Sequence, residues 1–185
     1  MPAIVELLAS PVHRFEGRPS DGPAPAPPGE VVTSIQIRAG LGIVGDRYFG
    51  KPAHRDASVT VIARESLPAG TGLAAVRRNI LVTGLPVDDL VGQILTLDSG
   101  DGPIRLQVNR KAHPCAWMDV TVAPGAWKAL RGHGGIRCTP LDDGILSVGP
   151  VTAFCTAADG PQPHRPRQER RVDRQHDINM STSSD

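Results

Sequence analysis

Glycine and proline limit the length of any regular element in this 185-residue chain, which contains 20 glycines and 18 prolines. Proline fixes φ and lacks a backbone N–H, and glycine favours turns, so neither residue suits the interior of a long helix. Aromatic residues make up only 3% of the chain. This composition is typical of short strands joined by tight turns, and it predicts a mainly β fold with a few short helices.

The length fits one domain that is large enough to bury its own core. The chain has 20 Lys and Arg residues against 19 Asp and Glu residues, which gives a formal net charge of +1. So small a net charge does not provide the field that attracts nucleic acid or an anionic membrane. We therefore expect no nucleic-acid or membrane partner, and any anion site must be local.

The cysteines, Cys115, Cys138 and Cys155, are odd in number and widely spaced. This pattern argues against a disulfide framework and against a structural zinc site, and it favours a reducing compartment. The apolar run at residues 4–9 is interrupted by Glu6 and lacks the basic start of a signal peptide. Because no apolar run is long enough to span a bilayer, we expect a soluble, cytoplasmic protein.

Two regions depart from the pattern of short strands. Residues 16–30 contain five prolines, which predicts an extended loop because proline is excluded from helix interiors and central strands. From residue 159 onward the apolar pattern disappears and charged residues dominate. We expect residues 1–158 to form one β domain and residues 159–185 to be a disordered polar tail.

Runs rich in β-branched residues predict the strands, and the turn residues between them predict where each strand ends. The expected strands are residues 3–8, 31–37, 58–63, 76–82, 94–97, 104–108, 134–138, 145–148 and 151–155, with a hairpin loop at 98–102 and helical turns at 64–67 and 86–90. The best short helix is residues 124–132, because it starts with a proline and ends with a glycine. Trp127 and Leu130 are expected to share its buried face.

The segment Arg-Lys-Ala-His-Pro-Cys, which ends at Cys115, has the strongest chemical signal. Arg110, Lys111 and His113 would each favour the thiolate, the form of cysteine that attacks electrophiles and binds soft metals. Pro114 disfavours a helix before it, so Cys115 is expected at a strand end or in a loop. The alternative is that Cys115 is a small buried hydrophobe, since free cysteine is among the most buried residue types.

Two other segments have polar residues where the chain turns. Residues 40–50 contain four glycines, which allow backbone N–H groups to approach a ligand closely. Their spacing matches no nucleotide-binding motif, so a turn in which Asp46 and Arg47 pair or cap is the simpler interpretation. Residues 77–79 (Arg-Arg-Asn) precede an apolar strand, and we expect Arg77 to be solvated there.

Several short motifs occur in one order and with a characteristic spacing across residues 3–156. They are Gly-Ile-Val-Gly-Asp-Arg at 42–47, Arg-Arg-Asn-Ile at 77–80, Leu-Val-Gly at 90–92, Pro-Cys at 114–115 and Gly-Gly-Ile-Arg at 134–137. Together they resemble the MOSC family, which is named for the C-terminal domain of molybdenum cofactor sulfurases. The resemblance implies a MOSC-type β-barrel over residues 1–158, with a cleft that holds a cysteine at the position of Cys115.

The resemblance also implies a site for the molybdenum cofactor, molybdopterin. Cys115 matches the cysteine that ligates molybdenum or carries persulfide sulfur in the family, which suits a soft thiolate. We expect Arg47, Arg78 and Arg137 to hold the pterin phosphate by charge-assisted bonds, with help from backbone N–H groups of the glycine loop. The predicted catalytic and metal-ligating residue is Cys115, and the predicted cofactor-binding residues are Gly45, Asp46, Arg47, Arg78, Asn79 and Arg137.

Two positions depart from the family pattern. Tyr48 follows Gly-Asp-Arg where many members have histidine, so a role that needs imidazole does not transfer to that position. Thr139 and Pro140 stand where many members have a second arginine, which weakens the case for anion contacts from that strand.

Three functions are compatible with these residues. The first is a molybdenum-dependent reductase of N-hydroxylated substrates, supplied with electrons by a separate protein because the chain has no flavin, haem or iron–sulfur motif. The second is a sulfur carrier, in which a pyridoxal-phosphate-dependent desulfurase partner loads a persulfide onto Cys115. No pyridoxal phosphate is expected on this chain itself. The third is a non-catalytic module that stores or escorts the cofactor.

Overall fold

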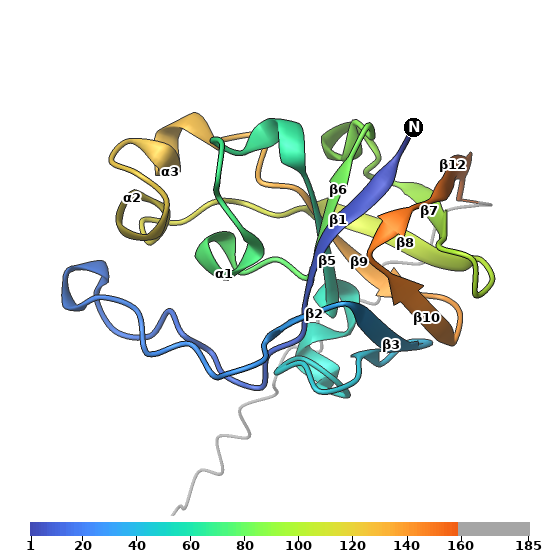
Figure 1. The fold of residues 1–185 in the computed structure, drawn as a ribbon, viewed down its shortest axis with the longest axis horizontal. Helices are drawn as coiled ribbons and strands as arrows, with labels where there is room; N and C mark the ends of the chain where they lie inside the picture. The colour runs from blue at the N-terminus through green and yellow to red at the C-terminus, as the bar shows by residue number, and fades with distance from the viewer. Residues whose placement is uncertain (159–185) are drawn as a thin grey trace, which may run out of the picture.

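The structure, a computed structural model, describes residues 1–158 and consists mainly of short strands (Figure 1). The strands are β1 (Ala3–Leu8), β2 (Val31–Val32), β3 (Ser34–Arg38), β4 (Gly42–Ile43), β5 (Val59–Ala63), β6 (Ile80–Thr83), β7 (Gln93–Asp98), β8 (Ile104–Lys111), β9 (Ile136–Pro140), β10 (Gly144–Ser147), β11 (Gly149–Pro150) and β12 (Thr152–Ala157). The helices are α1 (Leu73–Val76), α2 (Met118–Thr121) and α3 (Ala126–Ala129), with 3-10 turns η1 (Pro19–Asp21), η2 (Pro52–Ala57), η3 (Arg64–Ser66) and η4 (Val87–Asp89). The prediction of a mainly β fold with a few short helices is confirmed.

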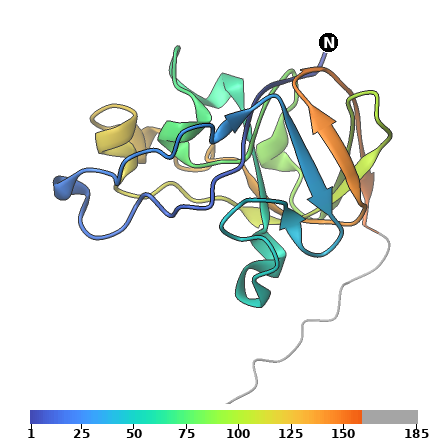
Figure 2. The same cartoon turned by 60° about the horizontal axis from the view of Figure 1, so that its bottom comes forward.

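Most strands belong to one large sheet with the order β11-β1-β6-β5-β9-β8-β7-β12, and β2 pairs with β1 outside this path. Its neighbours are antiparallel except β5 and β6, which run parallel. The sheet curls into a half-barrel (Figures 1 and 2). A smaller sheet, β10-β3-β4, contributes buried residues to the same core. The predicted hairpin at residues 98–102 is confirmed, because β7 and β8 pair on either side of it.

The large sheet is covered on both faces. Successive residues of a strand point to opposite faces, so a strand covered on both sides is apolar throughout. In β5 every residue is buried: Val61 packs in the core shared with the small sheet, and Ile62 packs against the helical layer. That layer comprises α1, α2 and α3, and it lies beside the loop between β1 and β2 in both views (Figures 1 and 2).

The predicted helix at residues 124–132 is shorter in the structure, where α3 spans Ala126–Ala129. The prediction that Trp127 is buried was wrong, because 40% of its surface is exposed. Ala126 and Leu130, four residues apart, make the buried stripe, so Trp127 points away from the layer and lies against Arg131.

Other element boundaries also differ from prediction. The expected strand at 31–37 divides into β2 and β3, and the expected strand at 76–82 starts only at Ile80. Cys138 is a core residue of β9, whereas Cys155 lies on β12 and is exposed. The predicted tail, residues 159–185, lies outside the described residues. Within the described part, every helix is too short to cross a membrane.

The large sheet depends on two adjacent glycines before β9. A Cβ atom on Gly135 would overlap the carbonyl oxygen of Val61, and φ at Gly135 is +84°. We expect Gly135→Ala to lower the free energy of unfolding by about 3 kcal/mol, from overpacking together with left-handed strain. Gly132→Ala is the matched control: Gly132 has a φ of +83° but no atom within 4 Å of the added Cβ. Equal losses in urea denaturation of the two variants would contradict this reasoning.

Candidate functional site

A cavity of about 190 Å³ lies where the large sheet meets the helical layer. Four of the predicted site residues line it: Arg47, Arg78, Cys115 and Arg137. They come from the loop after β4, the turn between α1 and β6, the loop after β8, and β9. Residues that are distant in sequence therefore line the same cavity.

Cys115 presents its thiol at this cavity. The residue is exposed and lies in the loop between β8 and α2, as the proline before it predicted. The alternative of a small buried hydrophobe is excluded for Cys115. That description fits Cys138 instead, because complete burial strongly raises the pKa of its thiol. Cys155 is exposed like Cys115, but it does not line the cavity.

Arg78 is a buried charge that is held by backbone carbonyl groups. Its Nε donates to the oxygen of Gly134 (3.0 Å) and its Nη1 to that of Val76 (2.9 Å). Its Nη2 lies 3.4 Å from the carbonyl oxygens of both Ala112 and His113. Burial, and then the positive charge of Arg137, lower the pKa of Arg78 to about 10, so the group remains charged at neutral pH. Arg78 thus anchors the loop that leads to Cys115.

Arg47 has donors without acceptors. Its side chain is 11% exposed, and its Nη1 lies 3.6 Å from Oδ2 of Asp46. Its guanidinium also lies over the ring of Tyr48, 4.5 Å from the ring centroid. Within the described residues, its Nε and Nη1 atoms are buried and have no hydrogen-bond partner. Because buried donors are almost always paired, these two atoms indicate a missing acceptor.

Arg137 supplies a second guanidinium with unused donors. It is half-buried on β9 and pairs across the sheet with Arg110 on β8. Burial, followed by the charge of Arg110, lowers the pKa of Arg137. Among residues 1–158, no hydrogen bond or ion pair involves this guanidinium. An anion would satisfy both Arg47 and Arg137.

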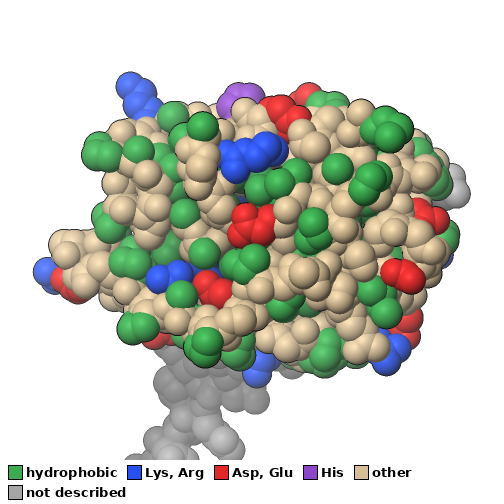
Figure 3. Space-filling model, in the orientation of Figure 1, with side chains coloured by type: hydrophobic (Ala, Val, Ile, Leu, Met, Phe, Trp, Pro, Cys, Tyr) green, Lys and Arg blue, Asp and Glu red, His purple; other side chains and the backbone are tan. Residues whose placement is uncertain are grey.

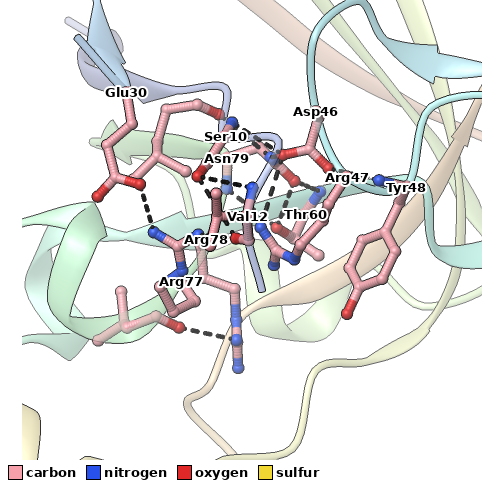
Figure 4. A network of polar contacts seen from close by, with 12 residues as sticks. Ser10, Val12, Glu30, Asp46, Arg47, Tyr48, Thr60, Arg77, Arg78 and Asn79 are labelled. Carbon is pink, nitrogen blue, oxygen red and sulfur yellow. Dashed lines mark hydrogen bonds and ion pairs between the residues drawn. The ribbon is translucent and has the colours of Figure 1, made fainter. Parts of the chain in front are cut away.

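Asp46 and Asn79 do not line the cavity but belong to a polar network beside Arg47 (Figure 4). Asp46 accepts hydrogen bonds from the backbone N–H of Tyr48 (3.0 Å) and from Nδ2 of Asn79 (3.0 Å). The Oδ1 atom of Asn79 accepts from the hydroxyl of Thr60 (2.8 Å). These contacts hold the Arg47 loop against β5 and β6, which is a positioning role. Gly45 is exposed in that loop and is also outside the cavity.

The expectation that Arg77 is solvated was wrong. Arg77 is buried with a φ of +54°, and its Nη1 donates to Oε2 of Glu30 (2.8 Å) (Figure 4). Its Nη2 donates to the carbonyl oxygen of Val12 (2.8 Å). The left-handed turn at the end of α1 directs the side chain inward, where the Pro-rich loop supplies the carboxylate. The ion pair therefore fixes the loop that covers one side of the cavity.

The first part of the connection between β1 and β2 brings two residues to the cavity that sequence reasoning missed, His13 and Phe15. Phe15 stacks on Trp117 with ring centroids 5.1 Å apart. Burial, and then the charge of Arg47, lower the pKa of His13, so its imidazole is neutral at neutral pH. Both residues lie in the connection after β1, which ends at Leu8, and no local pattern indicates where that connection folds.

A larger cavity of about 630 Å³ lies between η3, η4 and the end of α3. Its polar residues include Glu65, Asp88, Lys111 and His133, and it contains none of the predicted site residues. Over the face in Figure 3, charged side chains are scattered rather than gathered in one patch. We therefore take the smaller cavity as the candidate site, because it combines an exposed thiol with unpaired cationic donors.

No protein-family model matches the chain, and no curated protein matches it. Solved structures do match. The YuaD protein from Bacillus subtilis has a TM-score of 0.63 at 16% identity, covering 85% of this chain and 98% of YuaD. YiiM from Geobacillus stearothermophilus has a TM-score of 0.53 at 17% identity, covering 83% of this chain and 75% of YiiM.

Both of these proteins contain MOSC domains. The chain has a MOSC-type fold. The fold that the sequence motifs implied is thus confirmed, and at this level of identity the likeness concerns the fold alone.

The buried pair of Arg77 and Glu30 makes stability depend on pH. Although burial opposes the shift, the hydrogen bond from Arg77 lowers the pKa of Glu30 below its ordinary value of 4.5. A lowered carboxylate pKa stabilises the fold above the unfolded value, and this stabilisation is lost as the pH falls through the folded value. We expect Glu30→Gln to cost about 3 kcal/mol at pH 7, because it leaves a buried charge without its counter-ion.

The difference in free energy of unfolding between wild type and Glu30→Gln should stay constant from neutral pH down to about 5. Below pH 4.5 it should shrink. Asp143→Asn is a control at an exposed ion pair with Arg38, and it should change stability much less, because solvent screens that pair. A Glu30→Gln difference that is unchanged at pH 3.5 would contradict the assignment.

Proposed function

We propose that this chain is a stand-alone MOSC protein that binds the molybdenum cofactor at Cys115 and reduces N-hydroxylated substrates. The observation that carries the proposal is the meeting of an exposed thiol with the guanidinium groups of Arg47 and Arg137 in one cavity. A thiolate suits a thiophilic metal, and guanidinium groups suit a phosphate. The molybdenum cofactor has both features.

The hydrogen-bond donors of the cavity suit one end of the molybdenum cofactor. The guanidinium of Arg137 is half-exposed to an oxyanion, and the buried Nε and Nη1 atoms of Arg47 lack acceptors, whereas Arg78 donates to carbonyl groups. A volume of 190 Å³ is below the roughly 300 Å³ at which small-molecule sites begin, so only one end of the cofactor would lie inside.

A metal at Cys115 would need further ligands. Within residues 1–158, no group of three His, Cys, Asp or Glu side chains could hold a metal ion. The metal would therefore arrive within a cofactor that provides the remaining ligands, with Cys115 as the one ligand from the protein.

Each residue around the cavity has a task in this proposal. When bound, the cofactor supplies the two electrons that cleave an N–O bond. Cys115 binds the metal, and Arg47 and Arg137 hold the anionic end. The neutral imidazole of His13 forms a hydrogen bond to the substrate, and the stacked rings of Phe15 and Trp117 exclude water from one side. The electrons come from a partner protein.

Molybdenum and pterin content after expression in a cofactor-competent host tests the proposal. We expect stoichiometric molybdenum in the wild type and at least a tenfold lower content in Cys115→Ser, because the variant lacks the thiolate ligand. Cys155→Ser is the matched control, since it also removes an exposed thiol but lies outside the cavity.

Activity is then measured with N-hydroxylated compounds and a chemical reductant in place of the electron-donor protein. The reductase function requires that turnover follow molybdenum content across the variants. A wild type that never acquires molybdenum, or a Cys115→Ser protein that retains it, would contradict the proposal. Bound cofactor without turnover would instead indicate a storage module.

One observation also favours the second function, sulfur transfer. All three cysteines are free thiols, and that of Cys115 is exposed, so a partner desulfurase can reach it. The pyridoxal phosphate of that reaction belongs to the partner.

A further inference from the structure

We propose that the larger cavity binds an organic amine, that is, a molecule that carries an ammonium group on an apolar body. The site is separate from the candidate site above, because the two cavities share no lining residue. Three observations support the proposal: the size of the cavity, the excess of carboxylates on its wall, and one buried carboxylate oxygen that lacks a close hydrogen-bond donor.

The larger cavity has the size and the apolar wall of a small-molecule site. Its volume of about 630 Å³ falls within the roughly 300–1,000 Å³ that is usual for such sites. Apolar side chains reach it from the end of β5, the turn between β6 and η4, and α3; they are Ala63, Leu85, Pro86 and Ala129. These side chains offer the apolar body of a ligand a surface on which it leaves water.

The charges on this wall favour a cation. Three carboxylates line the cavity, those of Glu65, Asp88 and Asp89, against one ammonium group, that of Lys111. Within residues 1–158, the one basic side chain close enough to pair with any of these carboxylates is that of His133, which lies 3.7 Å from Asp88 and is 67% exposed. The local charge is therefore negative, which opposes an anion and attracts a positively charged ligand.

Asp88 has an oxygen that is available to such a ligand. The residue is only 9% exposed, and its Oδ1 accepts the N–H of Gly135 (2.9 Å). Among the described residues, its Oδ2 has only the hydroxyl of Ser66 at 3.4 Å and Nδ1 of His133 at 3.7 Å. Both distances exceed the roughly 2.7–3.0 Å of an ordinary hydrogen bond. Because buried acceptors are almost always paired, this oxygen indicates a missing donor, and an ammonium group would supply a charge-assisted bond.

The other two carboxylates contribute less. Oε1 of Glu65 already accepts from the hydroxyl of Thr83 and the N–H of Gly84, both at 2.7 Å, and the bond from Gly84 lowers the pKa of Glu65. Glu65 therefore holds the turn after β6 rather than a ligand. Asp89 is exposed, so water weakens its attraction for a cation. Asp88 is thus the residue that recognises the ammonium group.

A bare metal ion fits this cavity less well than an amine does. Within the part of the chain that the structure describes, no group of three His, Cys, Asp or Glu side chains could hold a metal ion. An ammonium group needs only one carboxylate, and the apolar part of the wall is left for the carbon atoms of the ligand. The cavity therefore suits an amine with a sizeable apolar body.

Calorimetric titration of the full chain with 2-phenylethylamine tests the proposal, with 2-phenylethanol as the neutral analogue of similar shape. We expect a single site for the amine, and about tenfold weaker binding of the alcohol, because a hydroxyl group brings no charge to Oδ2 of Asp88. Ethylamine should also bind about tenfold more weakly, because it lacks most of the apolar body.

Two variants separate the recognition of charge from that of shape. Asp88→Asn keeps an oxygen that can accept from Gly135 but loses the negative charge, and it should bind 2-phenylethylamine about tenfold more weakly. Ala129→Trp fills the cavity from the exposed helix α3 without a change of charge, and it should abolish binding. Asp101→Asn is the matched control, since Asp101 is an exposed carboxylate outside the cavity.

Absence of binding of 2-phenylethylamine to the wild type at millimolar concentration would overturn the proposal. Equal affinities for the amine and the alcohol, or an unchanged affinity in Asp88→Asn, would also overturn it. If Asp88→Asn does not fold, Ala129→Trp decides, because amine binding that survives in that variant lies elsewhere. The titration uses protein without molybdenum, so its outcome is independent of the proposed reductase function.

Discussion

The burial of one positive charge, the guanidinium of Arg78, determines where the chain must converge. A charge removed from water is costly unless hydrogen bonds replace its hydration. The replacement here is a set of carbonyl oxygens from Val76, Ala112, His113 and Gly134. These residues belong to three separate parts of the sequence, and they must meet around one guanidinium. Cys115 reaches the cavity because it lies two residues beyond this meeting point.

Two glycines make that convergence possible. A Cβ atom on Gly134 would overlap the carbonyl oxygen of Ala112, and one on Gly135 would overlap that of Val61. With no side chain present, the backbones approach closely, and Ala112 donates its N–H to the oxygen of Gly135 (2.7 Å). The close approach sets the start of β9, which in turn brings Arg137 to the cavity. The Gly-Gly-Ile-Arg motif thus combines a backbone contact with a side chain that lines the cavity.

Local sequence patterns correctly predicted the features that depend on interactions between residues close in the sequence. Strand content and the β7–β8 hairpin follow from residue propensity and turn chemistry, and Pro114 predicted the loop position of Cys115. The burial of Arg77 was not predicted, because its partner Glu30 is 47 residues away in the sequence. Glu30 also ends a loop that has no periodic sequence pattern. The motifs located Asp46 and Asn79 near the site but did not distinguish a ligand contact from a supporting network, since that difference depends on packing.

The distribution of carboxylates around the cavity supports the proposed anionic ligand beside Cys115. Glu30 forms an ion pair with Arg77, and Asp46 accepts a hydrogen bond from Asn79. Neither carboxylate is therefore free to pair with Arg137. A neutral occupant would desolvate the guanidinium of Arg137 and the buried donors of Arg47 without replacing their lost hydrogen bonds. An anion would replace them, and the exposed thiol of Cys115 lines the same cavity. The charges around the cavity therefore support the proposed anionic ligand before any contact specific to one ligand is considered.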